Sequence, residues 1–184
     1  MKFKDQLFSI IKENPLNIEI LKTVYHLKIK DCWIGAGFVR NTVWNKLHGI
    51  ENPAIDYDID VVFYFSENTD KSFESGLEKK LLHKMPNIKW SVKNQARMHI
   101  KNGHQDYANV SGAISHWPET ATSIAIKTDE YDNLDLIAPY GLEDLFNLIV
   151  KPTPEFDPDI VEKRVLEKKW LTKWHKLKYQ KNYN

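Results

Sequence analysis

The fold is decided by residues 34–62, whose sequence is IGAGFVRNTVWNKLHGIENPAIDYDIDVV. The apolar run Cys32–Ile34 predicts a short buried strand that ends in a Gly-Ala-Gly turn. After this turn apolar residues recur at helical spacing, at Val39, Val43, Trp44 and Leu47, and Gly49 follows where a helix would end. A second strand is predicted over Asp58–Phe65. The order of strand, glycine turn, helix and strand indicates a sheet packed against helices.

Further elements are predicted on both sides of this unit. Helices are expected over 5–14 and 17–27, with Asn17 as the N-cap of the second. Toward the C-terminus we expect a helix over 72–84, a strand over 90–92, a helix over 105–116, a hairpin of strands 123–126 and 134–137, a short helix over 142–149 and one final helix over 159–176. The fold class is therefore α/β (α+β), a mixed β-sheet flanked by helices with a C-terminal helix. Residues 1–184 form a single domain, with a core at about 17–150 and a helical extension at about 155–178.

Composition bounds the possible functions. At 42% hydrophobic residues the chain can bury a core, and a net charge of +1 gives no global basic field of the kind that points to nucleic acid. The single cysteine, Cys32, excludes an intramolecular disulfide, and we interpret it as a small buried hydrophobe. No apolar stretch approaches the roughly 20 residues that cross a bilayer, and the N-terminus lacks the apolar region of a signal peptide. We therefore expect a cytoplasmic protein without a membrane partner.

The glycine turn has the features of a phosphate-binding loop. Gly35 and Gly37 allow a sharp turn and let a phosphate approach backbone N–H groups closely. The helix that begins near Phe38 would direct its positive end at that phosphate. The dinucleotide-binding pattern G-x-G-x-x-G is not met, because Arg40 stands at its third glycine.

The Asp-x-Asp pair indicates a metal site. Side chains alternate faces along a strand, so Asp58 and Asp60 point the same way, roughly 7 Å apart. Two carboxylates this close repel each other unless a cation lies between them. Hard oxygen ligands suit Mg²⁺, or Mn²⁺, completed by water and phosphate oxygens. The structural alternative is an acidic pair that faces solvent at a sheet edge.

These residues together resemble the first two motifs of the nucleotidyltransferase superfamily. That superfamily includes poly(A) polymerases, CCA-adding enzymes, aminoglycoside nucleotidyltransferases and minimal nucleotidyltransferases. The stretch Ala36–Asn41, AGFVRN, is similar to the Gly-Gly-x-Val-Arg-Asp of CCA-adding enzymes. Ala36 replaces a glycine of that pattern and Asn41 replaces its aspartate, which tightens the turn and removes a charge beside it.

Longer blocks are similar to a narrower bacterial family of nucleotidyltransferase-like proteins. They are WSVKNQARMH at 90–99, WPETAT at 117–122 and APYGLEDLF at 138–146. The resemblance covers residues from about 30 to 175. It implies that a nucleoside monophosphate is transferred from a nucleoside triphosphate, ATP among the candidates, to an acceptor hydroxyl, and that pyrophosphate is released.

The resemblance also implies roles for particular residues. Asp58 and Asp60 would be catalytic and would hold metal; Gly35, Ala36, Gly37, Arg40 and Asn41 would bind the nucleotide. A third catalytic and metal-binding carboxylate is expected on a later strand, where Leu134-Asp135-Leu136 gives the best match. Asp135 is equally compatible with a turn-flanking residue, and Glu119 and Asp106 are the other candidates.

The acceptor is left open by the sequence. Lys93 and Arg97, with His99, are typical either of a phosphate or substrate patch or of a solvated charged segment. The acceptor could be a small molecule, a protein or RNA, and the weak net charge favours a small one. Two other hypotheses remain: a degenerate nucleotide-binding or regulatory module of the same fold, and an unrelated domain whose acidic pair is structural.

Overall fold

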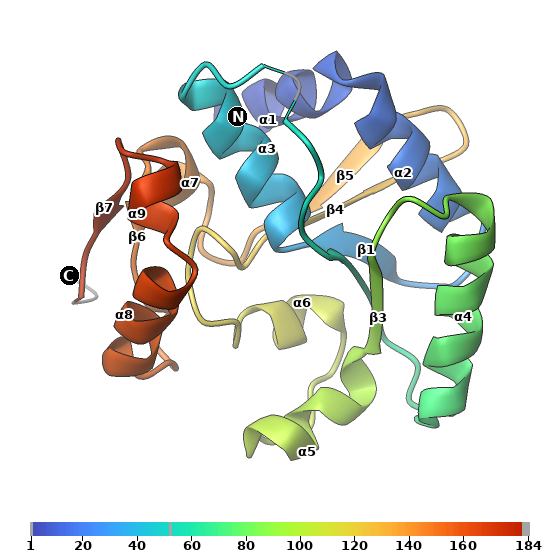
Figure 1. Cartoon of the computed structure of the whole chain (residues 1–184). Helices are drawn as coiled ribbons and strands as arrows, with labels where there is room; N and C mark the ends of the chain where they lie inside the picture. The colour runs from blue at the N-terminus through green and yellow to red at the C-terminus, as the bar shows by residue number, and fades with distance from the viewer. Residues whose placement is uncertain (1, 52, 182–184) are drawn as a thin grey trace.

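The computed structural model describes residues 2–51 and 53–181, and its centre is a five-stranded sheet (Figure 1). The strands of this sheet are β1 (Cys32–Gly35), β2 (Ile59–Phe63), β3 (Trp90–Asn94), β4 (Ala125–Thr128) and β5 (Leu134–Ile137). The longer helices are α1 (Lys2–Glu13), α2 (Pro15–Tyr25), α3 (Gly37–Leu47), α4 (Lys71–Lys84) and α8 (Pro158–Glu167). Shorter elements are η1 (Gln95–Arg97), α5 (Met98–Asn102), α6 (Val110–Ile114), α7 (Glu143–Phe146), α9 (Trp170–Lys173), β6 (Ile149–Val150) and β7 (Lys178–Tyr179). The predicted mixed α/β class is confirmed.

The strand order places β1 at the centre of the sheet. The order is β3-β2-β1-β4-β5, with β1 antiparallel to both neighbours and β2 parallel to β3. The predicted hairpin is confirmed, because β4 and β5 pair antiparallel. The β2 strand is shorter than predicted, so Asp58 lies just before it while Asp60 lies within it.

The two faces of the sheet are covered differently. Helices α1 to α4 contribute to the main core on one face, where the strand residues Ile34, Ile59, Val61 and Phe63 are buried. The opposite face carries a smaller cluster that includes Trp33, Val62 and Ala125 together with two residues of α6. Figure 1 shows α5 and α6 on that side, away from α1 and α3. Asp60 and Val62 alternate with the core residues of β2, so they face this second side.

The single final helix that we predicted is wrong. The chain forms α8 and α9, separated at Lys169, whose φ of 52° interrupts helical geometry. The break turns the chain so that β7 pairs with β6, which the sequence did not predict. The rings of Trp170 and Trp174 meet Trp44 of α3 edge-on, with centroids 5.8 and 5.1 Å apart. The C-terminal segment is therefore packed into the core next to α3.

Three other predicted helices differ from the observed ones. The N-cap of α2 is Asn14, whose side chain accepts from the Leu16 N–H, whereas Asn17 is buried inside the helix. The helix predicted over 105–116 is restricted to α6, because Asn109 caps it by accepting from the Gly112 N–H. The helix predicted over 142–149 ends after one turn, since Leu148 adopts a φ of 59° before β6.

Three large apolar side chains on helices lie at the surface. Leu82 of α4 and Ile160 and Leu166 of α8 are 48%, 49% and 67% exposed. Their neighbours Leu81, Val161 and Val165 are buried instead. Within the described ranges, no helix combines the length and apolar character that a membrane span requires.

Candidate active site

The glycine turn between β1 and α3 is closely packed at Gly35. A Cβ at Gly35 would lie 2.7 Å from Cη2 of Trp117 and 3.0 Å from the carbonyl oxygen of Ile124, so no side chain fits there. The Ala36 N–H donates to that same carbonyl at 3.1 Å. Ala36 adopts φ 50° and ψ −117°, a conformation that suits glycine rather than alanine. The turn is therefore held in a strained geometry by its surroundings.

The N-terminus of α3 directly follows this turn and has no side-chain cap. Helix α3 begins at Gly37, and the side chain of Ala36 cannot cap it. The first N–H groups of a helix have no partner within the helix, and the aligned peptide dipoles place partial positive charge there. Gly37 lies tight against its neighbours, because a Cβ would stand 3.3 Å from Cδ2 of Tyr57. This arrangement suits an anionic group such as a phosphate.

The acidic pair lies beside this turn. Asp60 lies directly opposite Gly35 in the β1–β2 pair, so its carboxylate is next to the start of the turn. Asp60 is half-buried and Asp58 is exposed. Burial raises the pKa of the Asp60 carboxyl, and the charge of Asp58 raises it further. The two predicted metal ligands are thus close enough to repel each other, next to the predicted phosphate turn.

Hydrogen bonding and nearby cations act against that rise. The Ser91 hydroxyl on β3 lowers the pKa of Asp60, as do the charges of Arg40 and Lys93. Ser91 is registered opposite Asp60 on the parallel strand β3. Sequence reasoning missed Ser91, because only the pairing of β2 with β3 brings it to the acidic pair.

Arg40 is directed into the protein. Its Nε and Nη2 donate to Oδ1 of Asn41 at 3.1 and 3.0 Å, and its Nη1 donates to Oγ1 of Thr122 at 2.9 Å. Its guanidinium also stacks 4.2 Å over the ring of Trp170. Burial lowers the pKa of Arg40 to about 10, and the charge of Glu119 opposes this shift. The two residues that we predicted to contact nucleotide, Arg40 and Asn41, are thus bonded to each other at the base of the turn.

Glu119 forms the centre of a buried ion network. It is fully buried, and its Oε1 accepts from Nε of Arg164 on α8 at 2.7 Å. Within the described parts of the chain, its Oε2 has no hydrogen-bond partner. Glu119 therefore links α8 to the segment before β4 and influences Arg40 on α3. This use of Glu119 differs from the metal-binding role for which it was a candidate.

Asp135 is not brought to the acidic pair. It lies on β5, which is separated from β2 by β1 and β4. Three strand spacings put the two backbones roughly 14 Å apart. Asp135 is opposite Lys127, and its carboxylate lies 3.7 Å from that ammonium nitrogen. Asp106, the other candidate, instead pairs with Nε2 of His99 at 2.9 Å.

Of the predicted substrate patch of Lys93 and Arg97, only Lys93 lies on the side of the acidic pair. Arg97 donates from Nε and Nη2 to both carboxylate oxygens of the buried Glu74 on α4, at 2.7 and 2.5 Å. Lys93 lies on β3 opposite Val62, which is on the same face as Asp60. Lys93 therefore has its charge on the side of the acidic pair, while Arg97 anchors α4 to the segment after β3.

The donor set suits one divalent cation. Two carboxylates on one face offer the hard oxygen ligands that Mg²⁺ prefers, and a bound triphosphate would supply more. No group of three histidine, cysteine or acidic residues with ligand geometry occurs among residues 2–51 and 53–181. The arrangement therefore matches an ion shared between two aspartates and a substrate.

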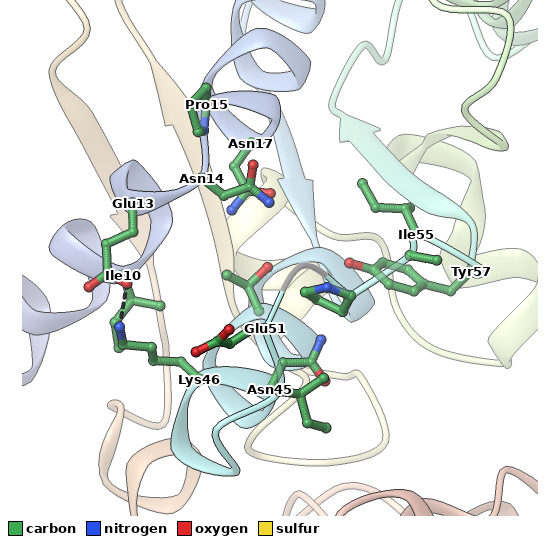
Figure 2. Close-up of a pocket in the computed structure, with 14 residues that line it drawn as sticks. Ile10, Glu13, Asn14, Pro15, Asn17, Asn45, Lys46, Glu51, Ile55 and Tyr57 are labelled. Carbon is green, nitrogen blue, oxygen red and sulfur yellow. Dashed lines mark hydrogen bonds and ion pairs between the residues drawn. The ribbon is translucent and has the colours of Figure 1, made fainter.

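A cavity of about 320 Å³ lies behind the loop that leads to Asp58 (Figure 2). It is formed by the end of α1, the start of α2, the C-terminal half of α3 and the loop before β2. Tyr57 lines it and also packs against Gly37. Burial raises the pKa of Tyr57 to about 12. The cavity therefore adjoins the site at Tyr57, the residue that directly precedes Asp58.

The fold, the glycine turn and the acidic pair together define a nucleotidyltransferase-type domain. A family model described as nucleotidyltransferase matches residues 22–179, and the chain belongs to this family. No curated protein sequence matches the chain.

Solved structures agree with this assignment. The chain is similar to a protein whose NMR structure reveals a CCA-adding enzyme head domain, with 33% identity, a TM-score of 0.84 and coverage of 96% of this chain and 95% of the other. It is also similar in fold to the Thermotoga maritima CCA-adding enzyme complexed with tRNA, with 16% identity, a TM-score of 0.57 and coverage of 94% of this chain but 42% of that enzyme. A CCA-adding enzyme bound to CTP gives 17% identity, a TM-score of 0.58 and coverage of 94% and 42%. The chain therefore spans less than half of these two enzymes.

Proposed function

We propose that this protein transfers a nucleoside monophosphate from a nucleoside triphosphate to an acceptor hydroxyl, with release of pyrophosphate, in a reaction that depends on Mg²⁺ or Mn²⁺. The observation that carries the proposal is the register of Asp60 opposite Gly35, which sets the acidic pair beside the α3 N-terminus. Both features suit one triphosphate, because the backbone donors bind phosphate oxygens and the carboxylates hold its cation.

Each group would have a distinct task in this reaction. The N–H groups at the start of α3 would bind the triphosphate and stabilise the negative charge that grows on the leaving pyrophosphate. Asp58 and Asp60 would hold the cation, which neutralises charge on the phosphates when bound. Lys93 would add a positive charge on the same face. Catalysis would come mainly from positioning and charge stabilisation.

Arg40 and Asn41 act as positioning residues in this proposal. Their bonds to each other and to Thr122 fix the first turn of α3, which sets the direction of the phosphate-binding N–H groups. Arg40 would contribute to nucleotide binding through this geometry and through its long-range charge.

The acceptor class follows from similarity rather than from a contact in this chain. Among similar structures are enzymes bound to tRNA and to CTP. These favour a nucleic acid hydroxyl as acceptor, whereas the net charge of +1 favours a small acceptor. A salt titration of acceptor binding separates them, because affinity for RNA falls steeply with ionic strength.

A nucleotide titration tests the proposal. ATP, CTP, GTP and UTP are added to the folded protein with and without Mg²⁺, and residue-resolved NMR shifts are recorded. We expect shifts at residues 35–41 and 58–60 that require the cation. Shifts confined to other residues, or none at millimolar nucleotide, would reject the proposal for this site.

The alternative function is a nucleotide-binding module without turnover. The specific observation in its favour is the absence of a third acidic ligand beside Asp58 and Asp60 in the described residues. Pyrophosphate release separates the alternatives, because a binding module would give the same NMR shifts and release no pyrophosphate with any acceptor.

A further inference from the structure

The positions next to Asp60 determine how many cations the site can hold. In the sheet, Asp60 has Gly35 on one side and Ser91 on the other. Neighbouring strands are roughly 4.8 Å apart, and a pair of catalytic cations lies about 4 Å apart. A carboxylate on either neighbouring strand would therefore lie near enough to bind an ion together with Asp60.

The β1 side cannot supply that carboxylate. Gly35 has no side chain, and the ring of Trp117 occupies the space where one would begin, 2.7 Å from the ideal Cβ position. Trp117 thus closes the sheet surface at this point. Of the two register partners of Asp60 in the described sheet, Ser91 is the one that has a side chain on the face of the acidic pair.

Ser91 offers a neutral hydroxyl in place of a charge. It is half-buried on β3, opposite Asp60, and the interaction with its hydroxyl lowers the pKa of the Asp60 carboxyl. A hydroxyl can donate its proton to a carboxylate, and it adds no negative charge. The acidic residues considered as alternatives have other partners: Asp135 pairs with Lys127, Asp106 with His99 and Glu119 with Arg164.

We propose that the Asp58–Asp60 site holds one divalent cation, which binds together with the nucleoside triphosphate, and that Ser91 occupies the position from which a third carboxylate would complete a second ion site. This inference rests on the proposed function. It goes further by fixing the ion stoichiometry, and it assigns Ser91 the role of a positioning residue that orients the Asp60 carboxylate.

Two carboxylates leave most of the coordination shell of one cation to phosphate oxygens and water. The cation should therefore bind weakly to the protein alone and much more tightly when a triphosphate is present. Reciprocity of linked binding requires that the cation strengthen nucleotide binding by the same factor.

The test counts Mn²⁺ ions by electron paramagnetic resonance, with and without the α,β-methylene analogue of ATP, which cannot release pyrophosphate. The variant Ser91→Asp adds the missing charge, and Ser91→Asn is its uncharged control of matched size. We expect one Mn²⁺ per unmodified chain in the presence of the analogue. Ser91→Asp should bind two, and should bind Mn²⁺ alone at least roughly tenfold more tightly, because affinity rises with ligand charge. Ser91→Asn should bind no more than one.

Two results would overturn the inference: two ions per unmodified chain, or equal stoichiometry and affinity in Ser91→Asp and Ser91→Asn. If Ser91→Asp does not fold, as judged by circular dichroism, the count on the unmodified chain decides alone. Asp58→Asn separates failure of this inference from failure of the proposed function. Loss of Mn²⁺ in Asp58→Asn together with a count of two refutes only the single-ion inference, whereas Mn²⁺ binding that survives Asp58→Asn refutes the proposed site itself.

Discussion

Two strands of the sheet carry an aspartate on the same face, and the two aspartates have opposite surroundings. Asp60 of β2 is half-buried, faces the α3 N-terminus across Gly35 and lies near the like charge of Asp58. Asp135 of β5 is exposed and pairs with Lys127 on the adjacent strand. In the sequence both follow the apolar-acid-apolar pattern of a strand.

The difference comes from strand order rather than from local sequence. Both aspartates precede apolar strand residues, yet β2 is a neighbour of β1 and β5 is an outer strand beyond β4. Only a neighbour of β1 can place a carboxylate beside the glycine turn that ends β1. Local patterns therefore identify candidate ligands, and topology selects among them.

The largest expected effect separates the two aspartates directly. Asp60→Asn keeps the size of the side chain and removes its charge, so pyrophosphate release should fall on the order of 100-fold or more, as for the loss of a group that stabilises the transition state. Asp135→Asn should leave the rate within about twofold, because it removes only an exposed ion pair. A steady-state pyrophosphate assay measures both variants. Equal losses would show that Asp135 belongs to the site.

The next effect compares a buried ion pair with the exposed pair of Asp135. Arg164→Ala leaves the fully buried Glu119 without the donor to its Oε1, so the free energy of unfolding should fall by about 3 kcal/mol. Lys127→Ala removes the partner of Asp135 and a contact over the ring of Trp33, and should cost about 1 kcal/mol or less. Urea denaturation measures both. If Lys127→Ala lowered the free energy of unfolding more than Arg164→Ala does, the buried Glu119–Arg164 pair would not be the more important of the two for stability.

A smaller effect concerns backbone strain in the turn between β1 and α3, which lies next to Asp60 and has no counterpart beside Asp135. Ala36→Gly should raise the free energy of unfolding by about 1 kcal/mol, because glycine adopts φ 50° and ψ −117° without the strain of alanine. Ala108→Gly is the control, at an exposed position without positive φ, and should be neutral or slightly destabilising. Thermal unfolding measures both. A decrease in Ala36→Gly would mean that the turn is not strained.

The smallest effect is a pH dependence of stability in the cation-free protein. Burial raises the pKa of Asp60 in the folded state, so the folded chain binds more protons than the unfolded chain just above the ordinary carboxyl range. The contribution of Asp60 to stability is therefore present at low pH and is lost as pH rises through the raised pKa. The difference in unfolding free energy between the unmodified chain and Asp60→Asn, measured with a chelator present, should show this slope. A difference that does not change with pH would contradict it.

Much of the fold could be predicted because local sequence specifies it. The run from Cys32 to Val62 combines an apolar strand, glycines and a helical repeat, and it predicted β1, α3 and β2 with small errors at the ends. Predictions were wrong where a single residue interrupts a periodic pattern. Lys169 breaks the final helix with a positive φ, and Leu148 ends α7 in the same way. Neither lysine nor leucine is a residue type that predicts a positive φ.

The sequence by itself determined the candidate chemistry of this protein. The glycine turn and the spacing of Asp58 and Asp60 follow from residue types and from the twofold alternation of a strand, which are local properties. The tertiary structure alone decided which groups meet. Pairing of β2 with β3 places Ser91 opposite Asp60. The position of α8 lets Arg164 pair with Glu119, and the pairing of β4 with β5 places Lys127 next to Asp135. The physical reason is that strand pairing and helix docking depend on burial of apolar faces between segments far apart in the chain, and a local pattern does not contain the identity of that partner.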